Sequence, residues 1–185
     1  MQIDFTEGRL AVKLDPSKNL LNQFIALNNR VLDQFSADQR SRIGIHTCPG
    51  GDHDSTHSAD VDYADFLPEL FSLNAGNFYL QLASEKNPER VLALIKQHMR
   101  PGQRIFIGVI DVLSTDIEEP ETVRDRVLQA ADFIPLAQLG TTDDCGFSPF
   151  EDDTSTGRDT AFAKIHARVL GTNMAAEKLA VSKSQ

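Results

Sequence analysis

The chain has 185 residues, of which 41% are hydrophobic and 24% charged, a balance typical of a single globular domain. No apolar run approaches the roughly 20 residues of a membrane span, and the opening MQIDFTEGRL lacks the long apolar stretch of a signal peptide. The net charge is −9, and the basic residues are scattered rather than clustered. Both features argue against nucleic-acid and membrane partners. We therefore expect a cytoplasmic protein that acts on small molecules.

Five short apolar runs are spaced along the chain, and each is nearly continuous. Such runs are typical of parallel strands buried on both faces. The predicted strands are Met1–Ile3, Ile43–Ile45, Phe78–Leu82, Ile105–Ile110 and, more weakly, Leu136–Leu139.

Helical patterns fill the intervals between these runs. The predicted helices are Ser17–Phe35, Asp62–Leu73, one opened by Asn87 and Pro88, one opened by Glu119 and Pro120, and Asp159–Leu179. In the last of these, Phe162, Val169 and Leu170 recur at helical spacing, so we expect them to face the core. The alternation of strands and helices predicts an α/β protein with a parallel sheet.

Polar or metal-binding residues close each predicted strand. In chain order they are Asp4, His46 with Cys48, Gln81, Asp111 and Cys145. In a (β/α)8 TIM-type barrel the carboxyl ends of all strands meet at one mouth, whereas an open doubly wound sheet binds ligands only near its switch point. The pattern therefore favours the barrel. Five strands cover roughly its C-terminal half, so we expect residues 1–185 to be one domain that is either a fragment or completed by a second copy or a missing N-terminal half.

His46, Cys48 and Cys145 are the residues best suited to bind a metal. His46 and Cys48 are two positions apart in IGIHTCPGG (residues 43–51), so they project to the same side of a strand. Cys145 follows another predicted strand in TTDDCGF (residues 141–147). Two thiolates and an imidazole with an open fourth position are typical of catalytic zinc, while structural zinc has four ligands with closely spaced cysteine pairs. We predict one catalytic Zn2+ ion; the alternative is two buried thiols acting as small apolar groups.

Several motifs together resemble one known family. HTCPGG (residues 46–51) followed by DDCGF (residues 143–147) resembles the zinc-binding C-terminal barrel of cobalamin-independent methionine synthase and its bacterial paralogues. MQIDFTEG at the start, IGVIDVLSTDIEEPE (residues 107–121) and FIPLAQLGTTDDCGF (residues 133–147) are similar to the same family. The resemblance runs in order over nearly the whole chain. It implies a zinc-dependent methyltransferase of methionine biosynthesis that moves a methyl group from a methylfolate to the thiol of homocysteine.

The resemblance also implies roles for individual residues. His46, Cys48 and Cys145 match the histidine and two cysteine ligands of zinc. Asp4 matches the aspartate that holds the amino group of homocysteine, and Asp111 is retained as a catalytic residue.

Two positions depart from the family. Gln81, in FYLQLAS, stands where the fourth zinc ligand is a glutamate, and a neutral amide is a poorer ligand; we keep it as the candidate fourth ligand and predict that Gln81→Glu tightens zinc binding. Acids and histidines of GDHDSTH (residues 51–57) are alternative ligands. Leu113 stands where the family has a histidine implicated in protonating the folate leaving group, which places the folate donor in question.

Three other interpretations remain open at this point. The first is a zinc-dependent thiol alkyltransferase with another donor, such as a methylated corrinoid protein or a small methylated compound. The second is a non-catalytic zinc-binding half-barrel. The third is a metal-free barrel like the uroporphyrinogen decarboxylases, which predicts no bound metal.

Overall fold

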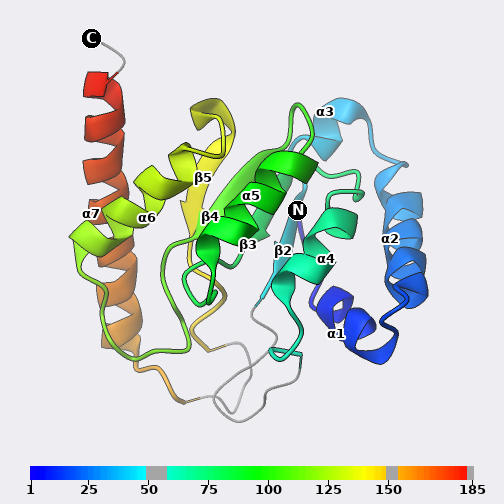
Figure 1. Cartoon of the computed structure of the whole chain (residues 1–185), viewed down its shortest axis with the longest axis horizontal. Helices are drawn as coiled ribbons and strands as arrows, with labels where there is room; N and C mark the ends of the chain where they lie inside the picture. Colours follow the sequence, from blue (N-terminus) through cyan, green and yellow to red (C-terminus); the bar gives the residue numbers. More distant parts are fainter. Residues whose placement is uncertain (49–57, 149–153, 183–185) are drawn as a thin grey trace.

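One sheet of five parallel strands forms the centre of the protein. The computed structural model describes residues 1–48, 58–148 and 154–182. The strands are β1 Gln2–Asp4, β2 Gly44–Thr47, β3 Asn77–Leu80, β4 Arg104–Gly108 and β5 Leu139–Thr142, and their spatial order equals their order in the chain. Figure 1 shows them side by side, from β2 to β5, behind the helices α4 and α5. The predicted α/β fold with parallel strands is confirmed.

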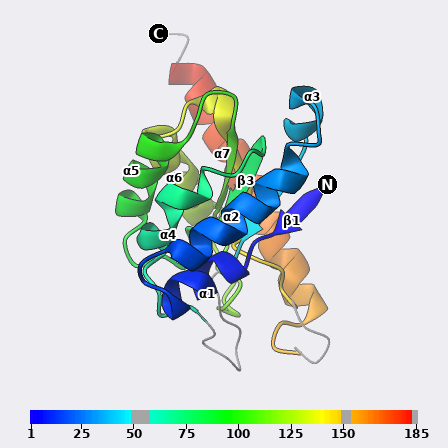
Figure 2. The same ribbon diagram turned by 90° about the vertical axis from the view of Figure 1, so that its right-hand side faces the viewer.

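Helices connect the strands and pack along the sheet. Within the described residues they are α1 Glu7–Leu14, α2 Asn19–Leu32, α3 Ala37–Arg40, α4 Tyr63–Leu70, α5 Pro88–His98, α6 Pro120–Ala131 and α7 Arg158–Ser182. Helix α1 packs against α2 and α4, α4 against α5, and α6 against α7 next to β5 (Figures 1 and 2). None of the described helices is long and apolar enough to cross a lipid bilayer.

Single residues explain where one helix and one strand begin. The side chain of Asn87 accepts the N–H of Arg90 at 3.0 Å and caps α5, as predicted. The pattern does not predict α1 or α3, which are short. Strand β5 begins later than predicted because Pro135 opens a 3₁₀ turn that takes up Leu136–Gln138.

The two faces of the sheet differ in burial, which corrects the expectation of strands buried on both faces. Ile45, Phe78 and Ile105 are register partners on adjacent strands, and all three are fully buried against the helices. On the opposite face, the partners His46, Tyr79 and Phe106 are only half-buried. The rings of Tyr79 and Phe106 stack there with centroids 4.7 Å apart.

Helix α7 buries a different stripe from the one predicted. Phe162 and Val169 are 59% and 47% exposed, so the expectation that they face the core is wrong, as it is for Leu170. The buried positions are small residues and one lysine, namely Lys164, Ala167, Gly171 and Ala175. A Cβ atom at Gly171 would lie 2.5 Å from α6, so small side chains are needed for the close approach of these two helices.

Candidate functional site

Asp4 and His46 lie together on the half-buried face of the sheet. Asp4 is the last residue of β1 and His46 the last but one of β2, and they are partners in the parallel register of those strands. Burial lowers the pKa of His46, and the negative charge of Asp4 partly opposes that shift. A neutral imidazole has a free lone pair, so His46 is in the protonation state that a metal ligand requires.

The thiols of Cys48 and Cys145 are in contact although their strands are not neighbours. Cys48 directly follows β2 and Cys145 follows β5, and the two side chains form a hydrogen bond. Strands β2 and β5 are three steps apart, which in a flat sheet would separate them by about 14 Å. A converging, barrel-like sheet would shorten this separation, and the loop after β5 that carries Cys145 also contributes.

The imidazole and the two thiols at the carboxyl ends of the strands are ligands that zinc prefers. Among the described residues, no three His, Cys, Asp or Glu side chains form a ready metal-binding cluster. The hydrogen bond that the Cys145 thiol donates to Cys48, together with burial and the charges of Cys48 and Asp4, raises the pKa of Cys145. Two adjacent thiols resist ionisation without a cation, and a thiophilic divalent cation removes that cost. Residues 51–57, which contain the alternative ligands, lie outside the described part of the chain.

Gln81 is held by two partners beside a cavity. Its Oε1 accepts a hydrogen bond from the guanidinium of Arg9 at 3.1 Å, and its amide nitrogen donates to Glu85. Arg9 comes from α1 and also donates to the carbonyl of Val61. The cavity has a volume of about 420 Å³, and its lining includes Leu113 with Gln81, Arg9 and Glu85. Ligation of zinc by Gln81 stays a prediction, to which the structure adds these two partners.

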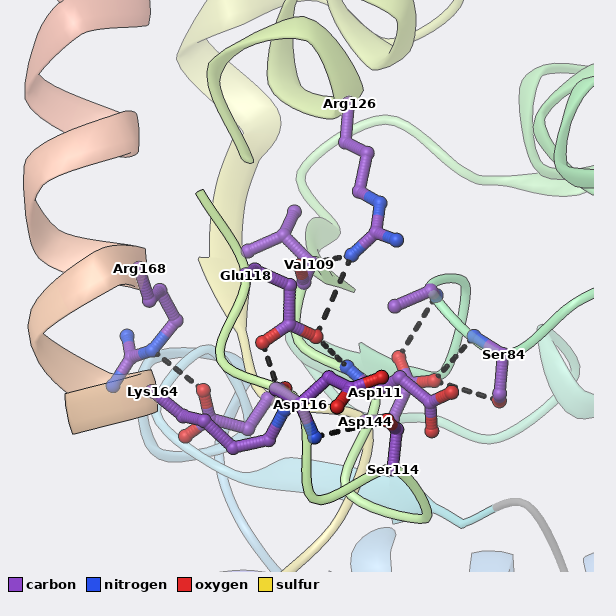
Figure 3. Close-up of polar contacts among 12 residues, drawn as sticks. Ser84, Val109, Asp111, Ser114, Asp116, Glu118, Arg126, Asp144, Lys164 and Arg168 are labelled. Carbon is purple, nitrogen blue, oxygen red and sulfur yellow. Dashed lines mark hydrogen bonds and ion pairs between the residues drawn. The ribbon is translucent and has the colours of Figure 1, made fainter. Parts of the chain in front are cut away.

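Asp111 lies three residues beyond the end of β4, at the start of a turn. Its Oδ1 accepts the N–H of Leu113 at 2.9 Å. Its own N–H donates to Glu118 at 2.8 Å (Figure 3). These bonds shape the loop that follows β4. A catalytic role for Asp111 stays a prediction.

Two cations of α7 reach the loops that follow β4 and β5. Lys164, which is fully buried, donates to the carbonyl of Asp116 and lies 2.8 Å from Glu118. Arg168, one turn later, lies 2.9 Å from Asp143 (Figure 3). Burial raises the pKa of Asp143 and outweighs the opposing effect of Arg168. The apolar periodicity of α7 hides these residues, so sequence reasoning missed them.

Asp144 is a buried acid that accepts four hydrogen bonds, and sequence reasoning missed it too. Its carboxylate accepts the N–H groups of Leu82, Ala83 and Ser84 and the hydroxyl of Ser84, at 2.7 to 3.0 Å. Burial raises the pKa of Asp144 to about 6, although these four hydrogen bonds act in the opposite direction. The only signal in the sequence is the doubled acid before Cys145.

Comparison with known proteins relates this arrangement to one family. Residues 2–165 match the family described as "Cobalamin-independent synthase, Catalytic domain". The chain is 36% identical over 93 residues to 2-hydroxypropyl-CoM lyase of Xanthobacter autotrophicus (strain ATCC BAA-1158 / Py2), which covers 50% of this chain and 23% of that protein. It is 29% identical over 126 residues to the uncharacterized protein YxjH of Bacillus subtilis (strain 168), which covers 66% of this chain and 32% of that protein.

A solved structure extends the likeness over nearly the whole chain. It is that of a B12-independent methionine synthase from Shewanella sp. W3-18-1 in complex with selenomethionine, with a TM-score of 0.71 at 20% sequence identity. The match covers 97% of this chain and 49% of that one, so this chain spans about half of the solved protein. Together with the five parallel strands in chain order, the match confirms the predicted partial (β/α)8 barrel. The chain therefore belongs to the family of cobalamin-independent synthase catalytic domains.

Proposed function

We propose that this chain supplies the zinc-binding, thiol-activating part of a methyltransferase site, with His46, Cys48 and Cys145 as ligands. The observation that carries the proposal is the contact between the two thiols, which come from non-adjacent strands. A free thiol has a pKa near 8.5, about 1.5 units above neutral pH, and is mostly protonated there. When bound, zinc would hold the thiol of a substrate as a thiolate.

The residues of the chain would set the chemistry of that sulfur. Cys48 and Cys145 would bring two negative charges, which favours an electron-rich sulfur nucleophile over the activation of water. Asp4 presents a carboxylate beside His46, suited to the ammonium group of an amino thiol such as homocysteine. The stacked rings of Tyr79 and Phe106 continue the same face and offer an apolar floor for a short carbon chain.

A second candidate is transfer of an alkyl group from a donor other than methylfolate. Leu113, which lines the cavity beside Gln81, has no proton to give to a leaving group. One relative is named as a lyase of 2-hydroxypropyl-CoM, so the reactions of the relatives extend beyond methyl transfer. The thiol-activating residues would serve both reactions.

Metal analysis of the purified protein tests the proposal. We expect one zinc ion per chain, complete loss of stoichiometric zinc in Cys48→Ser and in Cys145→Ser, and full zinc in His98→Ala, a control at the end of α5. Full zinc in both cysteine variants would contradict the assignment. A metal-free native protein would favour the uroporphyrinogen decarboxylase-like alternative.

Transfer assays then separate the donors. Zinc-loaded protein and homocysteine are incubated with methylfolate, with a methylated corrinoid protein or with a small methylated thioether, and methionine is measured. Formation of methionine from methylfolate supports the first candidate, and formation from another donor supports the second. Zinc binding without homocysteine binding or turnover, combined with the size of the particle in solution, would identify a non-catalytic half-barrel.

A further inference from the structure

The loop after β5 crosses over the end of β4. A Cβ atom added at Gly108, the last residue of β4, would lie 1.8 Å from Oδ1 of Asp144. The N–H of Asp144 donates to the carbonyl of Ile110 at 3.0 Å, so its backbone is tied to the same strand end. The missing side chain at position 108 is therefore what lets the Asp144 side chain pass over β4.

Beyond β4, the carboxylate reaches the loop that follows β3. Oδ1 accepts the N–H groups of Leu82 and Ala83, and Oδ2 accepts the N–H and the hydroxyl of Ser84 (Figure 3). An ionised carboxylate can only accept, and here both oxygens are used by donors. Asp144 thus links the loop after β5 to a strand that lies next to β2.

The neighbouring acid holds the loop from the opposite side. Asp143 is paired with Arg168 of α7 at 2.9 Å, while Asp144 points toward the β3 loop. Asp143 and Asp144 therefore fix the chain immediately before Cys145, the first to α7 and the second to the loop after β3. This arrangement explains how a residue that follows β5 meets one that follows β2.

We propose that Asp144 is a positioning residue that crosses Gly108 to hold the Cys145 thiol against Cys48. The inference deepens the proposed function, because it assigns the residue that would assemble the zinc-binding pair. Asp144 touches neither metal nor substrate in this assignment; it acts through the position of Cys145.

A matched pair of glycine variants tests the proposal. Gly108→Ala forces Asp144 out of its place. Gly146→Ala, on the other side of Cys145, adds a Cβ that has no neighbour within 4 Å among the described residues. The first readout uses metal-free protein and phenylarsine oxide, which binds tightly only where two thiols are close. We expect wild type and Gly146→Ala to bind one arsenical per chain and Gly108→Ala to bind it at least tenfold more weakly. Zinc affinity should fall in parallel by roughly 10- to 100-fold, the range for supporting residues around metal ligands.

Two further variants keep the test decisive if Gly108→Ala does not fold. Asp144→Asn loses an acceptor for the Ser84 N–H and should behave like Gly108→Ala. Ser84→Ala removes one of the four hydrogen bonds and should weaken arsenical binding by about two- to tenfold. Folded variants that bind the arsenical as tightly as wild type would overturn the proposal. If wild type binds the arsenical with this dependence on Gly108 but takes up no zinc, the proposed function fails while the role of Asp144 stands.

Discussion

The two sides of the candidate site are built in different ways. On one side, Asp4 and His46 are partners on adjacent strands, and Cys48 continues the second strand, so strand register alone brings them together. On the other side, Cys145 arrives from β5, and its place depends on Asp144 and the β3 loop. Register is a local property of paired strands. The contact between Cys48 and Cys145 instead depends on long-range interactions, which the hydrogen bonds of the buried Asp144 provide.

The difference has consequences for how each side responds to mutation. Changes on the β1–β2 side should alter stability without moving the ligands. Changes on the β4–β5 side should alter stability through unpaired buried charges, and the zinc site through Cys145.

The largest effect is expected at the buried charge of α7. Lys164→Met removes the nearest cation from Glu118, whose side chain is only 9% exposed. The buried carboxylate then keeps only the longer pair with Arg126, at 3.8 Å, and the N–H of Asp111. We expect a loss of about 3–5 kcal/mol in the free energy of unfolding, measured by urea denaturation. The control is Lys13→Met, which breaks an exposed pair with Asp60 and should cost at most about 1 kcal/mol. Equal effects of the two variants would mean that the β4–β5 side does not rely on buried charge.

A smaller effect is expected on the β2 side. Thr47→Val removes the hydrogen-bond partner of the buried Tyr63 hydroxyl, which links β2 to α4. The unsatisfied hydroxyl should cost about 1–3 kcal/mol of stability. Zinc affinity should remain within about twofold of wild type, because strand register still places His46 and Cys48. A tenfold loss of zinc affinity would show that register alone is not sufficient on this side.

The smallest effect is expected between Gln81 and Glu85. Gln81→Glu replaces the amide that donates to Glu85 with a second carboxylate, so the two acids oppose each other. A double-mutant cycle compares the effect of Gln81→Glu on the free energy of unfolding in wild type and in Glu85→Gln. We expect the change to be about 1 kcal/mol more favourable in Glu85→Gln. The predicted tightening of zinc binding should likewise be larger in the double variant. Zinc affinities that do not respond to position 81 in either background would argue that this side chain does not face the metal.

The fold and part of the site could be predicted because they depend on local patterns. Buried apolar runs and capped helices indicate parallel strands with helical connections, and spacing in the chain places His46 and Cys48 on one side of β2. The buried face of α7 could not be predicted, because Lys164 and small residues contact α6 while Phe162 is exposed. Periodicity shows which residues share a face, but the shape of the partner decides which face is buried.

The amino-acid sequence was enough to show which chemical groups follow the successive strands. They are an acid after the first strand, a histidine with a thiol at the second, and a second thiol after the last. That the two thiols meet became apparent only from the three-dimensional arrangement of the loops. That contact arises because Gly108 leaves space for Asp144 to reach the β3 loop. Hydrogen bonds and packing between segments far apart in the chain have no periodic signature, so their effect on Cys145 becomes visible only in three dimensions.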